Sequence, residues 1–226
     1  MFLSSFKNAI GLILSGDTAT YQAIALSIKV GFIATVIAAI IGLPIALMLS
    51  TKRFRGRALL VTIFNAFMGL PSVVVGLLGY GLLSHRGILG MLNLLFTPYA
   101  IIMGDIMLGI PTMVAIAESS LSDYHDKINE TVKTLSLSKL DGNILLIKES
   151  IYGIMGALSA CFGRIFEEVG AAMMLGGNIM GITRTMTTAI ALETTKGEFD
   201  RGVALGMILL SISISVNIAL QWFKKR

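Results

Sequence analysis

Long apolar runs separated by short polar stretches make up most of this chain. A helix needs about 20 apolar residues to cross the hydrocarbon core of a bilayer, and five runs meet that length. They cover roughly residues 21–50, 58–83, 98–118, 151–176 and 201–222. This pattern predicts an all-α integral membrane protein with about five transmembrane helices.

The composition also indicates that the chain is surrounded by lipid. Hydrophobic residues make up 55% of the 226 residues and charged residues only 14%, against roughly 25% charged in a typical globular domain. A soluble chain of this length could not bury so much apolar surface. The net charge of +5 comes without a basic stripe interleaved with aromatic residues, so it indicates topology and not nucleic-acid binding.

Most of the basic residues lie in three polar stretches, at 51–57, 119–150 and 223–226. These stretches follow the first, third and fifth spans, so alternating crossings place all three on one side, and the positive-inside rule makes that side the cytoplasm. The N-terminus is then outside and the C-terminus cytoplasmic.

The first 16 residues are treated separately from the transmembrane domain of residues 17–226. Phe2, Phe6 and Ile10 recur at helical spacing, which favours an amphipathic helix lying on the outer membrane surface. A signal peptide is the alternative, but Lys7 interrupts its apolar region.

Three spans contain a proline well inside: Pro44, Pro71 and Pro111. Each proline removes a backbone hydrogen bond and is expected to bend its helix. In transporters such breaks often border the pathway, although a kink can also serve only the packing of the bundle.

The longest polar stretch, residues 119–150, carries an apolar stripe of its own at Ile128, Val132 and Leu135. The pattern predicts two short helices with a turn at Asp141–Gly142. A loop helix with an apolar stripe indicates a docking partner.

This stretch resembles the coupling loop of ABC-transporter permease subunits, whose motif runs Glu-Ala-Ala, three residues, then Gly. Here Glu130-Thr131-Val132 stands at the start, and Ser136 occupies the glycine position. The resemblance implies that the loop docks into a groove on a separate ATPase subunit. The expected coupling residues are Glu130, Thr131, Val132, Ser136, Asp141 and Gly142.

A more specific resemblance covers residues 162–206. The motifs are Gly163-Arg164, Glu168-Val169-Gly170-Ala171, Gly177-Asn178, Gly181-x-Thr183-Arg184 and Thr187-Thr188. They resemble the oxyanion permeases of the molybdate and sulfate group, and most closely the tungstate-specific ones. Residues 54–57, 70–84 and 95–105 fit the same subgroup, so the resemblance extends over nearly the whole chain.

That resemblance implies the type I ABC importer permease (MetI-like) fold in a prokaryotic plasma membrane. It implies a second copy of the chain, two ABC ATPase subunits that bind ATP and Mg²⁺, and an extracytoplasmic tungstate-binding protein. This chain itself is then expected to hold no cofactor or metal and no catalytic residue. Molybdate or sulfate is the runner-up substrate.

Arg164 and Glu168 are four residues apart, so on a helix they share a face and can pair. They form either a structural clamp or part of a gate. A glutamate would repel a dianion, which argues against a substrate ligand. We therefore expect the pathway or gate at Pro71, Arg164, Glu168 and Gly170.

The segment that follows offers amides, hydroxyls and one guanidinium, which are groups that suit an oxyanion. By the predicted topology it is external. The expected oxyanion-facing residues are Gly177, Asn178, Thr183 and Arg184, and a plain surface turn is the alternative.

Two other function classes compete. An ion-coupled secondary transporter could use Arg164 and Glu168 as its coupling pair, but it would leave the folded loop at 119–150 unexplained. A membrane hydrolase is disfavoured because His85 and His125 fall in loops on opposite sides.

Overall fold

The computed structural model describes residues 10–11 and 17–224, and within them every regular element is helical. The amphipathic helix predicted for residues 1–16 therefore falls almost entirely outside the described part of the chain.

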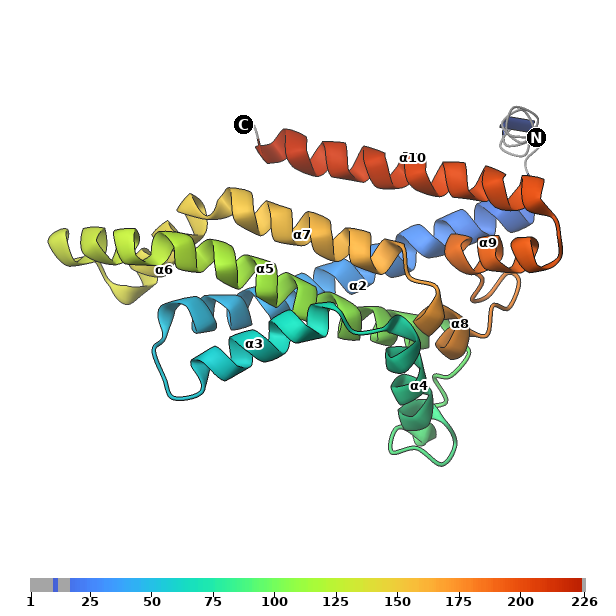
Figure 1. The fold of residues 1–226 in the computed structure, drawn as a ribbon, viewed down its shortest axis with the longest axis horizontal. Helices are drawn as coiled ribbons and strands as arrows, with labels where there is room; N and C mark the ends of the chain where they lie inside the picture. Colours follow the sequence, from blue (N-terminus) through green and yellow to red (C-terminus); the bar gives the residue numbers. More distant parts are fainter. Residues whose placement is uncertain (1–9, 12–16, 225–226) are drawn as a thin grey trace.

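Three helices are each long and apolar enough to cross a membrane: α2 (Thr18–Thr51), α5 (Pro98–Thr134) and α10 (Phe199–Lys224). They correspond to the first, third and fifth predicted spans (Figure 1). Helices α2 and α5 continue through Pro44 and Pro111 without a break in either helix. Two further pairs of helices are bent at a short break, residues 57–68 with 72–83 and residues 140–149 with 151–166, and counting each pair as one span raises the number to five.

The remaining elements are short. They are α3 (Arg57–Met68), α4 (Ser72–Leu83), η1 (Gly90–Leu92), α6 (Lys139–Glu149), α7 (Ile151–Phe166), α8 (Gly170–Gly176) and α9 (Met186–Thr195). The second predicted span is thus the pair α3 and α4, and the fourth is α7 and α8 with an interruption at 167–169.

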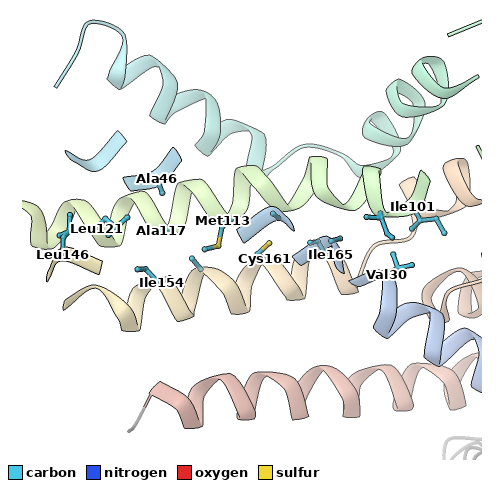
Figure 2. Close-up of a cluster of buried hydrophobic side chains, with 14 of the residues drawn as sticks. Val30, Ala46, Ile101, Met113, Ala117, Leu121, Leu146, Ile154, Cys161 and Ile165 are labelled. Carbon is cyan, nitrogen blue, oxygen red and sulfur yellow. The ribbon is translucent and has the colours of Figure 1, made fainter. Parts of the chain in front are cut away.

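Helix α5 lies at the centre of the molecule, packed between α2 and α7 (Figure 2). Small residues bring these helices together. A side chain at Gly109 would place its Cβ 2.7 Å from Ile165 Cδ1 and 3.1 Å from Ala38 Cβ. Close approach of this kind is how helices associate in lipid, where no hydrophobic effect drives them together.

The chain bends by 101° between α3 and α4, which confirms the bend predicted at Pro71. Pro71 is the N-cap of α4, in extended conformation, so the helix restarts in a new direction. Helix α4 then packs against α8 through Gly76, whose Cβ would lie 3.0 Å from the Cα of Ala171.

The predicted turn at Asp141–Gly142 is wrong. Helix α5 continues to Thr134, the chain turns over residues 135–138, and Ser136 adopts the left-handed conformation with φ of 48°. Asp141 and Gly142 lie in the first turn of α6, where Ser138 caps the helix. Gly142 permits contact between helices instead, because its Cβ would lie 2.9 Å from Val132 Cγ2.

The basic stretches gather at one end of the molecule. The end of α2 and the end of α5 with α6 lie at one end, towards which α10 runs, while α9 and the start of α2 lie at the opposite end (Figure 1). This arrangement agrees with the prediction that the three stretches share one side.

Candidate functional site

Arg164 stands in the last turn of α7, and Glu168 lies just beyond it in the interruption before α8. The guanidinium Nη1 is 3.5 Å from Glu168 Oε2 and 3.9 Å from Glu167 Oε1. Glu168 is buried, whereas the side chain of Glu167 is 69% exposed. The predicted pair is therefore formed, and its acid is enclosed by protein.

The same guanidinium reaches a second helix break. Arg164 Nη2 donates a hydrogen bond of 3.0 Å to the carbonyl oxygen of Leu70, immediately before Pro71. The Leu70 carbonyl lies in the break between α3 and α4, and Arg164 gives it a hydrogen-bond partner. We call Arg164, Glu167, Glu168 and the Leu70 carbonyl the Arg164 cluster.

Glu168 also organises the start of the next two helices. Its Oε1 accepts a hydrogen bond of 2.8 Å from the amide of Ala171 in α8. Its carbonyl accepts one of 2.6 Å from the Thr187 hydroxyl in α9. A charged acceptor at a helix N-terminus satisfies an orphan N–H and suits the helix dipole.

Gly170 completes the convergence. A Cβ at this position would lie 2.8 Å from Ser72 Oγ and 3.1 Å from the backbone nitrogen of Val73. Helix α8 thus touches the start of α4 at a residue next to Pro71. The structure brings all four predicted pathway residues together around two helix breaks.

Sequence reasoning missed Asp105, which lies on α5 and is 3% exposed. Asp105 and Glu168 line one cavity of about 20 Å³, together with Ser27, Thr185 and Thr187. The available signal was a single carboxylate inside the third apolar run, because ionisable residues at membrane depth mark functional sites by default.

A second arginine cluster, also missed, lies at the basic end. Arg57 Nη2 is 2.7 Å from Glu118 Oε1, and its Nε donates to the Leu49 carbonyl at 2.5 Å. Ser122 donates to the same Glu118 oxygen at 2.8 Å. We call Arg57, Glu118, Ser122 and the Leu49 carbonyl the Arg57 cluster. It joins α2, α3 and α5.

The loop after α8 is held by the residues predicted to face an oxyanion. Gly177 and Asn178 both have positive φ, at 70° and 51°. The buried Thr183 hydroxyl donates to the Gly176 carbonyl at 2.5 Å and accepts from the Ile179 amide at 2.9 Å. Arg184 donates to the side-chain and main-chain oxygens of Asn178.

Arg184 also lines a pocket of about 120 Å³ at this end of the molecule. Two more cations and two carboxylates surround it: Lys196, Arg201, Asp17 and Glu193. Arg201 pairs with Asp17 at 3.2 Å, and Lys196 with Glu193 at 3.2 Å. The side-chain hydrogen bond from Thr20, together with Arg201, lowers the pKa of Asp17 below its ordinary value.

The predicted coupling residues lie around the junction of α5 and α6. Glu130, Thr131 and Val132 are in the last turns of α5, and Ser136 forms the turn. A cavity of about 340 Å³ lined by Val132 and Gly142 separates this junction from the end of α2. Three exposed apolar side chains mark its outer surface: Leu135, Leu140 and Ile144.

Comparison with known proteins gives matches over nearly the full length, although no protein-family model matches the chain. A tungstate uptake system permease protein of Peptoclostridium acidaminophilum is 37% identical over 212 residues, 94% of this chain and 93% of its own. The corresponding protein of Campylobacter jejuni is 36% identical over 220 residues, 97% of this chain and 92% of its own. A probable anion ABC transporter permease protein of Haloferax volcanii is 37% identical over 207 residues, 89% of each chain.

Proposed function

Since this chain belongs to the ABC-transporter permeases of the oxyanion group, we propose that it is the membrane-spanning subunit of an ATP-driven tungstate importer. Two relatives, from two different organisms, are named tungstate uptake system permease proteins, and they support this substrate. Molybdate and sulfate have the same charge and similar shape, and they are the competing substrates.

The Arg164 cluster is the gate in this proposal. The observation that carries it is the double attachment of Arg164, to Glu168 at the α7–α8 break and to Leu70 at the α3–α4 break. Broken helices in transporters border the pathway, and their segments can change direction as rigid bodies. One guanidinium that holds two such breaks ties their movements together, with Pro71 and Gly170 as the points where the backbone turns.

The α5–α6 junction is the coupling element. Exposed Leu135, Leu140 and Ile144 present an apolar surface at the basic end, and an amphipathic helix in a partner's groove can transmit a rigid-body movement. The partner is an ABC ATPase subunit that binds ATP and Mg²⁺, with two such subunits for two copies of this chain. Those subunits hydrolyse ATP, so this chain acts as a transport subunit and not as an enzyme.

The opposite end receives the substrate from an extracytoplasmic binding protein. It carries Arg184 beside a pocket with two further cations, and the loop of Gly177, Asn178 and Thr183 positions that arginine. The protein is a multi-pass protein of the prokaryotic plasma membrane. The clustering of basic stretches at the other end supports a cytoplasmic C-terminus and an external N-terminus.

Tungstate uptake at low external concentration, in cells with and without this chain, tests the proposal. We expect uptake that requires the chain, stops on ATP depletion and resists excess molybdate and sulfate. Uptake that is abolished by molybdate at the same concentration as tungstate would make the protein a broader oxyanion permease. Uptake driven by an ion gradient without ATP would contradict the ABC mechanism and favour a secondary transporter.

A further inference from the structure

The interior beside Arg164 contains more negative than positive groups. Asp105 and Glu168 share one cavity, and Arg164 is the cation that acts on both. Glu168 already has partners for both carboxylate oxygens, the Ala171 amide and the Arg164 guanidinium. Asp105 Oδ1 is buried and has no hydrogen-bond partner among the described residues.

No neighbouring helix supplies a second cation. The cavity receives Ser27 from α2, while Thr185 and Thr187 come from the start of α9. One turn along α5 the buried Cys161 thiol of α7 donates to the Gly109 carbonyl. The charged groups that face Asp105 are therefore Glu168 and Arg164 alone within the described chain.

The neutral hydroxyls are already engaged. Thr187 donates to the Glu168 carbonyl, Thr185 bonds to Thr188 and Thr187, and Ser27 accepts from the Met186 amide. A cavity of about 20 Å³ is large enough for one water molecule with several polar neighbours.

An ionised carboxylate buried without a partner is costly enough that the group takes up a proton or pairs instead. We propose that Asp105 is a proton-binding site. Its carboxyl group is protonated in this conformation and donates a hydrogen bond to one water molecule in the cavity, which in turn donates one toward Glu168. The proton comes from solvent and returns to solvent, so no other reactant is needed.

The site sits against the proposed gate, because Glu168 lies in the α7–α8 break. A rearrangement of that break that removed Glu168 and admitted water would let Asp105 release its proton. Proton occupancy would then report the state of the gate. This consequence rests on the proposed function, whereas the proton site itself does not.

Infrared spectroscopy of the purified full-length permease tests the site without any transport assay. Exposed carboxyl groups have ordinary pKa values of about 4 and are ionised at neutral pH. We expect the carbonyl stretch of a protonated carboxylic acid at neutral pH in the wild-type protein, and its loss in Asp105→Asn. Asp123→Asn is the matched control, since Asp123 lies on the same helix and is exposed; it should keep the band.

A second measurement covers the case in which Asp105→Asn does not fold. Aspartate labelled with ¹³C at the side-chain carboxyl should shift the band in the unsubstituted protein, whereas labelled glutamate should not. The proposal is overturned if the wild-type band is absent, if it persists in Asp105→Asn, or if it follows labelled glutamate. Absence of the band with thermal stabilisation by sodium would assign a metal cation to the cavity and would also overturn it.

Discussion

The Arg57 and Arg164 clusters are built from the same parts and differ in how tightly they hold. Each combines an arginine, a buried glutamate and a carbonyl near the end of a helix. In the Arg57 cluster the guanidinium lies 2.7 Å from its glutamate and ties the end of α2 and the start of α3 to α5, which is continuous at Glu118. In the Arg164 cluster the separation is 3.5 Å, both helices are broken, and a second buried acid lies in the same cavity.

In the proposed function, the Arg57 cluster is a fixed attachment and the Arg164 cluster is one that changes partners. A short charge-assisted hydrogen bond with balanced charge stabilises a single arrangement. A longer pair with a surplus acid leaves an alternative partner available, which a two-state element requires. In the proposed function, the same side-chain chemistry anchors the helices at the basic end and permits movement at the gate.

The largest effect should follow substitution of Arg164. Arg164→Ala leaves Glu168 buried without its cation, and breaking such a pair costs about 3–5 kcal/mol. We expect the free energy of unfolding to fall by that amount, and uptake per folded molecule to fall more than in any other variant because the two helix breaks lose their common attachment. Transport in reconstituted vesicles measures the loss. Arg164→Lys should not restore it, because an ammonium lacks the planar fork that serves two acceptors.

Arg57→Ala should damage stability and spare transport. Its guanidinium is partly exposed, so we expect a loss of about 2 kcal/mol in the free energy of unfolding as Glu118 loses its partner. Thermal melting in detergent measures the change, with the exposed Arg55→Ala as control. A fall in uptake per folded molecule as large as that of Arg164→Ala would erase the distinction between the two clusters.

A glycine pair tests the packing at the interior breaks. Gly170→Ala places a methyl group within 2.8 Å of Ser72 Oγ, and overpacking of this kind costs about 1–3 kcal/mol. Gly163→Ala, seven residues earlier in open space on α7, should be neutral or stabilising because alanine favours a helix. Equal melting temperatures for the two variants would argue against close contact between α4 and α8.

The smallest effect should come from Glu167→Gln. Glu167 is exposed and lies 3.9 Å from Arg164, and exposed pairs contribute about 0–1 kcal/mol. Uptake and melting should stay close to wild type. A large loss would mean that Glu167, and not Glu168, is the partner that matters for movement.

Much of this comparison was accessible from sequence where the cause is local. Apolar run length predicted the long helices, a missing N–H predicted the bend at Pro71, and the spacing of four predicted the pair of Arg164 and Glu168. Asp105 carried a signal of its own, a carboxylate inside an apolar run, but its proximity to Glu168 could not be predicted because it depends on how α5 packs against the α7–α8 break. The two arginine clusters looked unrelated for the same reason.

The misplaced turn has a different cause. Glycine serves both turns and close helix contacts, and Gly142 serves the second, which sequence alone cannot separate from the first. The turn instead uses Ser136 in a conformation that glycine adopts more readily. The family motif, with glycine at that position, held the better signal.

The hydrogen bond between Arg164 and Leu70 also joins two segments that are synthesised at different times. The two residues are 94 positions apart, an interval of roughly 5 to 20 seconds at about 5–20 residues synthesised per second. An unpaired carbonyl in hydrocarbon costs several kcal/mol. The Leu70 carbonyl gains its Arg164 partner only after α7 has been synthesised.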